Sequence, residues 1–264
     1  MIMTKVGLYS VLRVYTLMFG VGAGELAGFA WQWLLPAGIA TLLMAAFGTL
    51  AAVRLRILTG YLVLVSAGTL FIAFALAQAG SIGAGLYYLS HSTFVAAALF
   101  LIVELVRQQR GTDRMNVVLP MRKRALAGSL FMICAIAAIG LPPLSGFVGK
   151  VGLLQAVPEG RVGWVWSTVL LSSLFVLVAM ARAGSKLFWV VAPPGSYVDT
   201  VVSTPRRTRR VEIAAIVLLL AYGVGMTLAA GPVLRYTLAA GGQLVDPGNY
   251  IDAVRAQKPA MREP

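Results

Sequence analysis

Three basic side chains lie inside long apolar stretches of this 264-residue chain: Lys5, His91 and Lys150. Ionisable residues are costly to keep in an apolar surrounding, and those that occur there are commonly functional. Imidazole changes its charge near neutral pH, and a lysine amine removed from water can hold or release a proton. The three positions therefore predict proton transfer through an apolar protein interior.

Each of these residues also has a simpler interpretation, which the sequence leaves open. Lys150 can extend its ammonium group to a membrane surface, or pair with a carboxylate of another chain. Lys5 can be a cytoplasmic flank of the first apolar stretch, and His91 can be hydrogen-bonded to a neighbouring hydroxyl. We favour a functional role for Lys150, because no acidic residue lies near it in the sequence.

The segment before Lys150 cannot form a plain helix. Residues 140–150 contain two prolines and three glycines in the middle of the apolar run Ala125–Val157. Pro142 and Pro143 remove two backbone donors, and such an interruption is tolerated at membrane depth only where protein or a water-filled cavity satisfies the freed carbonyls. We predict a helix break over Gly140–Gly146, formed by Gly140, Pro142, Pro143 and Gly146, of the kind that transporters use at ion sites.

The composition indicates that these residues lie in a membrane protein. The chain is 59% apolar and 12% charged, with a mean hydropathy of +0.85, whereas an ordinary globular domain has about 25% charged residues. This excludes an ordinary soluble enzyme, and the net charge of +13 is placed between apolar runs rather than on a nucleic-acid-binding face. One cysteine, Cys134, and one histidine allow neither a disulfide framework nor a multi-histidine metal site, so we expect no metal and no cofactor.

Seven apolar segments predict the elements that position these side chains. Six are long enough to cross a bilayer, and a shorter one carries Lys5 at its start and Arg13 inside it. The segments are Val6–Gly20, Trp31–Val53, Ile57–Ala79, Ile82–Val103, Ala125–Val157, Gly163–Ala181 and Val211–Leu234. The predicted fold is an all-α polytopic membrane protein with about seven transmembrane helices, one of them discontinuous.

The charges between the segments predict the orientation of the chain. Basic residues gather in alternate connections, at Arg54 and Arg56, over Arg107–Arg124 and over Arg206–Arg210, whereas the other connections are nearly free of them. Cytoplasmic loops collect lysine and arginine, so we expect these three connections and the N-terminus in the cytoplasm. The tail after Arg235 then lies on the outer side.

Four segments resemble a known family in order and spacing. They are TKVGLYSVLRV (Thr4–Val14), RLRILTGYLVLVSAGTL (Arg54–Leu70), LSHSTFVAAALFL (Leu89–Leu101) and GLPPLSGFVGK (Gly140–Lys150). Together they resemble the second half of the D subunit of the multisubunit Mrp/Pha-type monovalent cation/proton antiporters. That component is similar to the antiporter-like proton-pumping subunits of respiratory complex I.

The resemblance implies a helical bundle of inverted five-helix repeats, each with a discontinuous helix, and a line of buried groups that conducts protons. By position it assigns proton translocation to Lys5, His91, Lys150 and Arg56. Ala96 stands where many relatives have a buried lysine. We interpret residues 1–235 as the proton-conducting domain, lacking the family's first half, and residues 236–264 as a C-terminal tail.

We therefore expect a transporter subunit rather than an enzyme. Its partners would be the other antiporter subunits of a hetero-oligomer, the lipid bilayer, protons and Na+ or K+, with no nucleic acid. Its place would be the plasma (inner) membrane if the cell is bacterial. The alternatives are a proton-pumping membrane subunit of an NADH-quinone oxidoreductase-like complex, and a structural remnant that conducts nothing.

Overall fold

The computed structural model describes residues 2–28, 31–115, 121, 124–189 and 210–256, and throughout these ranges the regular secondary structure is helical. The α-helices are α1 (Ile2–Met18), α2 (Trp31–Ala51), α3 (Leu55–Ala75), α4 (Ala79–Arg110), α5 (Arg124–Ile139), α6 (Ser145–Gln155), α7 (Val162–Gly184), α8 (Arg210–Leu228), α9 (Ala230–Val245) and α10 (Gly248–Ala256). Short 3-10 turns, η1 (Val21–Leu26) and η2 (Glu159–Arg161), precede α2 and α7, and a π-helical turn, η3 (Ser185–Trp189), extends α7.

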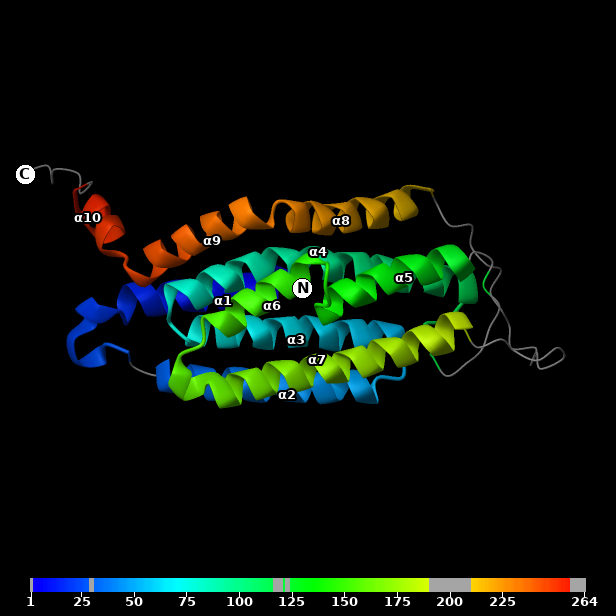
Figure 1. Ribbon diagram of the computed structural model, residues 1–264, viewed down its shortest axis with the longest axis horizontal. Coiled ribbons are helices and arrows are strands. Elements are labelled where there is room, and N and C mark those ends of the chain that lie inside the picture. The colour runs from blue at the N-terminus through cyan, green and yellow to red at the C-terminus, as the bar shows by residue number, and fades with distance from the viewer. Residues whose placement is uncertain (1, 29–30, 116–120, 122–123, 190–209, 257–264) are drawn as a thin grey trace, which may run out of the picture.

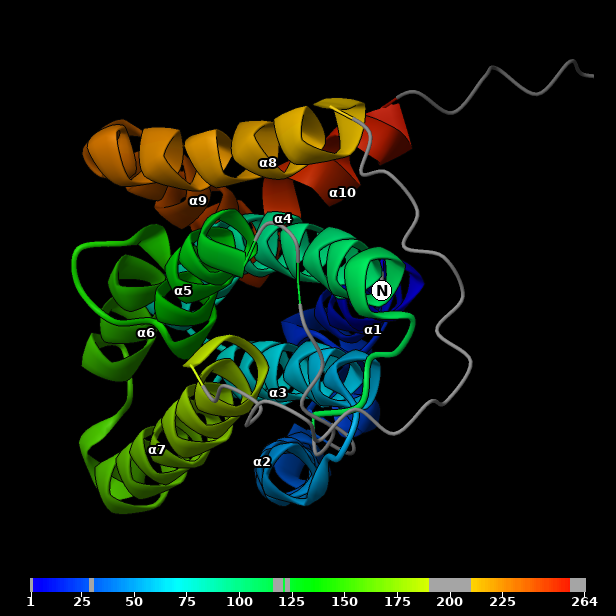
Figure 2. The ribbon, with the colours of Figure 1, turned by 90° about the vertical axis from the view of Figure 1, so that its right-hand side faces the viewer.

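The long helices lie side by side around α4, which packs against α3, α5, α6, α8 and α9 (Figure 1). Seen along the bundle, α8 and α9 cover one side of α4, while α3 lies on its other side and α2 and α7 lie beyond α3 (Figure 2). Residues of α3 and α4 such as Leu70, Ile72, Tyr87 and Ile102 are fully buried. The helix that carries His91 is therefore the centre of the bundle.

The outward faces of the peripheral helices are apolar. Large apolar side chains are exposed on α2, α7 and α8, among them Met44, Trp164, Leu218 and Leu228. Five helical stretches in the described ranges have the length and hydropathy of a membrane span, and α5 is a shorter apolar helix. An apolar surface of this extent is stable in lipid, so the fold is that of an all-α integral membrane protein.

The predicted break in the fifth apolar segment is confirmed. Helix α5 ends at Ile139 and α6 begins at Ser145, and the two stand beside each other in Figure 1 rather than forming one rod. Gly140 has a φ of +80°, a conformation that glycine adopts without steric cost, and the Pro142–Pro143 peptide bond is cis. Three of the residues predicted to form the break, Gly140, Pro142 and Pro143, thus lie between the two helices, whereas the fourth, Gly146, lies in the first turn of α6.

The last predicted span, Val211–Leu234, needs a correction. It is divided into α8 and α9 at Ala229, and the predicted domain boundary at residue 235 falls inside α9. Pro232 accounts for the division, because it lacks the amide hydrogen that would bond the carbonyl of Leu228 four residues earlier, and its ring crowds that carbonyl.

The two ends of the bundle differ in charge. Helices α4 and α7 end, and α3, α5 and α8 begin, at the end that faces the viewer in Figure 2. There the segment after α4 pairs with the start of α3: Leu55 N donates to Asp113 O (2.9 Å) and Met115 N donates to Val53 O (3.0 Å). The described basic residues of the predicted cytoplasmic connections, Arg54, Arg56, Arg114 and Arg210 among them, belong to this end. Residues 116–120, 122–123 and 206–209 of those connections lie outside the described ranges.

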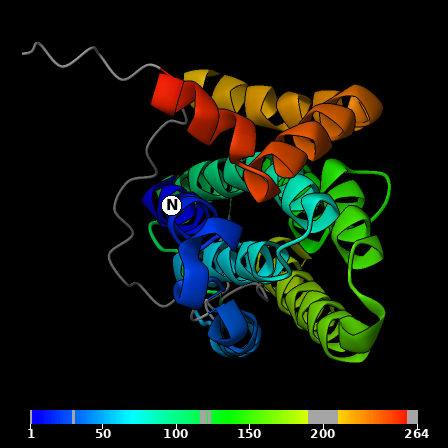
Figure 3. The same ribbon diagram turned by 90° about the vertical axis from the view of Figure 1, so that its left-hand side faces the viewer.

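The opposite end is formed by the end of α1, η1, the start of α2 and the end of α9, with α10 beside them (Figure 3). Arg13, which interrupts the first apolar segment, lies over the ring of Tyr250 in α10, with its guanidinium carbon 5.1 Å from the ring centroid. This contact accommodates the charge of Arg13 by a cation–π interaction.

Candidate functional site

Lys5, His91 and Lys150 are brought into one buried region from three different helices. Lys5 belongs to α1, His91 to α4 and Lys150 to α6, and their relative exposures are 2%, 2% and 8%. His91 directly precedes Ser92, which binds Lys5, and it is hydrogen-bonded to Ser145 at the start of the helix that carries Lys150. We call these three residues the basic row.

Lys5 is held by hydroxyl groups of α4. Its ammonium Nζ donates to Ser92 Oγ (2.6 Å) and to Thr93 Oγ1 (3.1 Å). The two hydroxyls in turn donate to the carbonyl of Leu89, one turn earlier in the same helix. The interpretation of Lys5 as a solvated flank is therefore wrong, because its side chain points into the bundle.

Lys150 is held by the helix break. Its Nζ donates to the carbonyl oxygen of Ile139 (2.7 Å), the last residue of α5, and to Ser173 Oγ of α7 (2.8 Å). An unbroken helix would use the Ile139 carbonyl for its own hydrogen bond. Interrupting the helix therefore creates the acceptor that binds Lys150.

His91 is bonded on both ring nitrogens. Its Nδ1 lies 2.7 Å from Ser145 Oγ, at the first residue of α6, and its Nε2 lies 3.1 Å from the carbonyl oxygen of Ala137 in α5. The imidazole thus spans the break, with one nitrogen on each helix. The hydroxyl that the sequence leads us to expect beside a buried histidine comes from a helix 54 residues away along the chain.

The glycines of the break make these contacts possible. A Cβ atom at Gly146 would lie 2.6 Å from both Ala137 O and His91 Nε2, which is far inside van der Waals contact. A Cβ atom at Gly140 would lie 3.0 Å from Lys150 Cδ. Gly146 therefore leaves room for the hydrogen bond between His91 and the Ala137 carbonyl. Gly140 leaves room for the side chain of Lys150.

Arg56 is not part of the basic row. It is exposed in the first turn of α3, at the basic end of the bundle, where its charge acts on Glu104. Glu104 forms an ion pair with Arg107 at 2.9 Å rather than with a lysine of the basic row. The structure therefore does not bring Arg56 together with Lys5, His91 and Lys150, and its assignment to proton translocation stays a prediction.

Ala96 is buried in α4 beside a small cavity. The cavity holds about 20 Å³ and is also lined by Ser66, Tyr88, His91 and Ser92. That volume is sufficient for about one water molecule. The small side chain of Ala96 thus lies beside a void that His91 and Ser92 also reach.

The hydroxyl partners are the residues that sequence reasoning misses. Ser145 belongs to the segment Gly140–Lys150, but the sequence assigns it no role. Ser92 is noticed in the sequence only because it follows His91. Ser173 gives no signal, because one serine in an apolar helix is common. Within the described ranges Lys5 and Lys150 contact no carboxylate, and no group of three His, Cys, Asp or Glu side chains could hold a metal ion.

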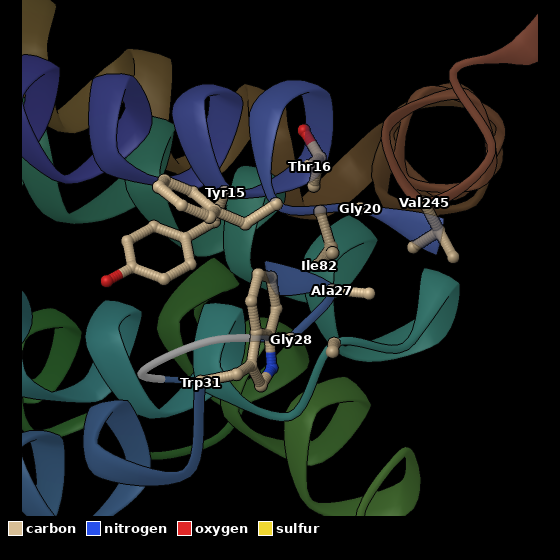
Figure 4. Close-up of a pocket in the computed structure, with 10 residues that line it drawn as sticks. Tyr15, Thr16, Gly20, Ala27, Gly28, Trp31, Ile82 and Val245 are labelled. Carbon is tan, nitrogen blue, oxygen red and sulfur yellow. The ribbon is translucent and has the colours of Figure 1, made fainter. Parts of the chain in front are cut away.

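Besides a cavity of about 330 Å³ between α5 and the end of α7, two larger cavities border the described part of the bundle. One of about 340 Å³ lies between the helix break and α7, and Lys150 and Ser173 line it. The other, of about 420 Å³, lies at the end opposite the basic connections, with Tyr15 and Trp31 facing it and Gly20 and Gly28 leaving it open (Figure 4). Two of its polar lining groups are bonded within the protein: Trp31 Nε1 donates to Ala75 O and Thr16 Oγ1 donates to Arg13 O. Of the basic row, Lys150 lines the first cavity, and no member lines the second.

Comparison with known proteins agrees with this geometry. A family model described as "NADH:quinone oxidoreductase/Mrp antiporter, TM" matches residues 1–176. The chain is 33% identical over 284 residues to the D subunit of a probable K+/H+ antiporter of Rhizobium meliloti (strain 1021), covering 96% of this chain and 51% of the relative. It is 31% identical over 256 residues to the D subunit of the Na+/H+ antiporter of Bacillus subtilis (strain 168), covering 96% and 50%. The chain thus spans about half the length of the curated relatives it matches.

Solved structures share the fold. A chain of the Mrp complex from Dietzia sp. DQ12-45-1b matches with a TM-score of 0.80 at 22% identity, over 95% of this chain and 53% of that one. A chain of respiratory complex I from Thermus thermophilus matches with a TM-score of 0.71 at 21% identity, over 91% and 51%. From the extent of the family match and the similarity to the two named antiporter relatives, the chain belongs to the NADH:quinone oxidoreductase/Mrp antiporter transmembrane family.

Proposed function

We propose that the chain is a membrane subunit of a multisubunit monovalent cation (Na+ or K+)/proton antiporter, and that protons cross it through the basic row. The observation that carries the proposal is the row itself: two lysines and the chain's one histidine, all buried, held by hydroxyls and by carbonyls of a broken helix. Buried ionisable groups at a broken helix are how membrane proteins build proton and ion pathways.

The hydrogen-bond partners suit a lysine that changes its protonation state. A hydroxyl can accept a hydrogen bond from an ammonium group and can donate one to the neutral amine. Ser92, Thr93 and Ser173 supply such groups, two for Lys5 and one for Lys150. His91 hydrogen-bonds to Ser145 of the helix that carries Lys150, and an imidazole can take up and release a proton. We assign the steps to residues 1–235; Arg56, which the resemblance also assigns to proton translocation, would act apart from the row, at the basic end of the bundle.

The partners in this proposal are the other subunits of the antiporter. Relatives are named as antiporter subunits, and similar chains occur in multisubunit complexes. Helices with exposed apolar faces would contact lipid and those subunits, in the plasma membrane of a bacterial cell. The coupled ion would be Na+ or K+, the ions in the names of the relatives. We propose no bound cofactor.

The test is cation-driven proton movement in vesicles that contain the chain with its partner subunits. Lys150→Ala should reduce exchange to the rate of protein-free vesicles. Lys150→Arg should do the same, because a guanidinium stays charged at any working pH and cannot release a proton. Lys186→Ala is the matched control, since Lys186 is exposed at the end of α7, and it should exchange at the wild-type rate. Wild-type exchange by the arginine variant would show that a fixed charge is sufficient.

A second candidate is a proton-pumping membrane subunit of an NADH-quinone oxidoreductase-like complex. The N subunit of NADH-quinone oxidoreductase from Desulforamulus reducens (strain ATCC BAA-1160 / DSM 100696 / MI-1) is 26% identical over 61% of this chain, and complex I shares the fold. The same vesicles separate the two candidates. An antiporter changes the internal pH of the vesicles in response to a cation gradient alone. A redox pump changes it only when electrons are transferred to quinone.

A further inference from the structure

Ser145 has a position that the proposed proton path does not yet use. It is fully buried, begins α6 directly after the helix break, and its hydroxyl lies 2.7 Å from His91 Nδ1. Within the described ranges, the histidine is the partner of this hydroxyl. The bond therefore joins the imidazole to the helix that carries Lys150.

The other nitrogen of His91 fixes the direction of this hydrogen bond. Nε2 lies 3.1 Å from the carbonyl oxygen of Ala137, and a carbonyl oxygen can only accept. Nε2 must therefore carry a hydrogen. A neutral imidazole has one N–H, so Nδ1 is bare when His91 is neutral, and the Ser145 hydroxyl is the donor to it.

From this geometry we infer that Ser145 is the residue that orients His91 for proton exchange, and that His91 gains and loses its proton at Nδ1, on the α6 side, through this hydroxyl. The inference rests on the proposed function and names a residue and a nitrogen for its central step. When a proton arrives, Ser145 passes its own hydrogen to Nδ1 and its oxygen receives the incoming one. The serine is unchanged, His91 becomes imidazolium, and the donor group has lost one proton.

The protonated state needs the opposite bond. Imidazolium donates from both nitrogens, so Ser145 Oγ becomes the acceptor and its hydrogen must point away from His91. The orientation of the Ser145 hydroxyl, at the start of α6, thus depends on the charge of His91. The Nε2–carbonyl bond is compatible with both states, because Nε2 keeps its hydrogen throughout.

The surroundings of His91 direct the exchange to this side. The titratable groups that face the ring are Lys5 from α1, Lys150 from α6, and Tyr88, whose ring centroid lies 5.9 Å away on α4 itself. Helix α5 contributes the Ala137 carbonyl, and α3 contributes Ser66 of the small cavity. With Nε2 bound to a carbonyl, Nδ1 is the nitrogen whose partner can both give and take a hydrogen.

The chain has a single histidine, so nitrogen NMR of the full chain in lipid bilayers, labelled with 15N-histidine, reports on His91 alone. The wild type should show a neutral ring with hydrogen on Nε2 and a hydrogen-bonded, unprotonated Nδ1. Ser145→Ala should keep the tautomer and move the Nδ1 signal to that of a nitrogen without a donor. Ser145→Thr should restore it. A wild-type ring with its hydrogen on Nδ1 would overturn the inference.

Exchange in vesicles with the partner subunits tests the role of the hydroxyl. Ser145→Ala should slow exchange by at least about tenfold without changing the cation concentration for half-maximal rate, because only the proton step is affected. Ser145→Thr should recover most of the rate. Ser129→Ala is the control, since Ser129 is exposed and bonded within its own helix. Undiminished exchange in Ser145→Ala would refute the relay.

The two hypotheses fail in different ways. If Lys150→Ala left exchange intact while the NMR signals were as expected, the proposed proton path would be wrong and the orientation of His91 by Ser145 would stand. If Lys150→Ala abolished exchange while Ser145→Ala did not, the path would stand and the serine relay would fall.

Discussion

The two lysines of the basic row are held in different ways, although both are buried and neither contacts a carboxylate in the described part of the chain. Lys5 extends from a continuous helix to two hydroxyls on α4. Lys150 binds one hydroxyl and one backbone carbonyl, which is available because the helix before it ends. One lysine thus depends on side chains alone, and the other depends on the path of the backbone.

This difference has a chemical consequence. A carbonyl oxygen accepts hydrogen bonds and donates none, whereas a hydroxyl does both. The two hydroxyls around Lys5 accept from an ammonium group while they donate to the Leu89 carbonyl, and either can turn its one hydrogen to a neutral amine instead. The surroundings of Lys150 keep one fixed acceptor, so its amine retains a hydrogen directed at Ile139 in either state. Lys150 should therefore be the more sensitive of the two to changes in the backbone of the break.

The largest effect is expected from Gly146→Ala. The new Cβ would lie 2.6 Å from Ala137 O and from His91 Nε2, so the histidine or the start of α6 must move. Because crowding of a packed core typically costs about 1–3 kcal/mol, we expect a clearly lower melting temperature together with loss of exchange. Thermal unfolding in detergent and exchange in vesicles measure the two effects.

Gly60→Ala is the matched control for that variant. Gly60 lies in α3, where an added Cβ would have no atom within 4 Å, and alanine is the better helix former by about 1 kcal/mol. It should therefore unfold at the same or a higher temperature. A Gly146→Ala protein as stable and active as Gly60→Ala would show that the break is looser than its contacts imply.

Gly140→Ala should have the next largest effect, and it should act on one lysine only. The backbone φ of +80° costs a residue with a Cβ about 1–2 kcal/mol, and the Cβ would press on Lys150 Cδ at 3.0 Å. We expect lower stability and slower exchange, while the bonds of Lys5 persist. The exchange rate of Ser92→Ala, taken relative to its parent, should not change when Gly140→Ala is added to both. A change in that relative rate would mean that the two ends of the row are coupled through the backbone.

The sequence reveals the basic row because charge is conspicuous in an apolar chain. Two prolines in a membrane segment likewise predict a break, since they remove donors that nothing in lipid can replace. The hydrogen-bond partners of the row cannot be predicted from the sequence. Ser92, Ser145 and Ser173 resemble any small residue in a helix, and packing between distant segments decides which side chains they contact. The position of Arg56, exposed and apart from the basic row, is likewise not visible in the motif, because a position in a motif does not say which side chains pack around it.

The second break gives a weaker signal than the first. By hydropathy Pro232 belongs to one apolar span, whereas in the structure it separates α8 from α9 at Ala229. A single proline is compatible with a kink or with a helix start, and the sequence does not distinguish them. The structure shows how the bend is held: the Tyr87 hydroxyl of α4 donates to the Met226 carbonyl at 3.0 Å.

Removing single hydroxyls should have smaller effects, and Ser173→Ala should exceed Ser92→Ala. Ser173→Ala leaves Lys150 with the Ile139 carbonyl alone, which cannot donate to a neutral amine. Since a hydrogen bond to a charged group contributes about 1.5–3 kcal/mol, exchange should fall by at least about tenfold. Exchange rates in vesicles, compared with those of the Ser129→Ala control, measure the effect.

Ser92→Ala should have the smallest effect, because Lys5 keeps Thr93 Oγ1 at 3.1 Å, and that hydroxyl still accepts and donates. We expect exchange to fall by no more than a few-fold, in line with about 0.5–1.5 kcal/mol for one of two hydroxyl bonds. The double change of Ser92 and Thr93 to alanine should then cost more than the sum of the single changes, because it leaves the buried ammonium without either hydroxyl. A double-mutant cycle on exchange rates measures this excess. Additive effects of the two changes would mean that Lys5 finds another acceptor, and that its surroundings are no more adaptable than those of Lys150.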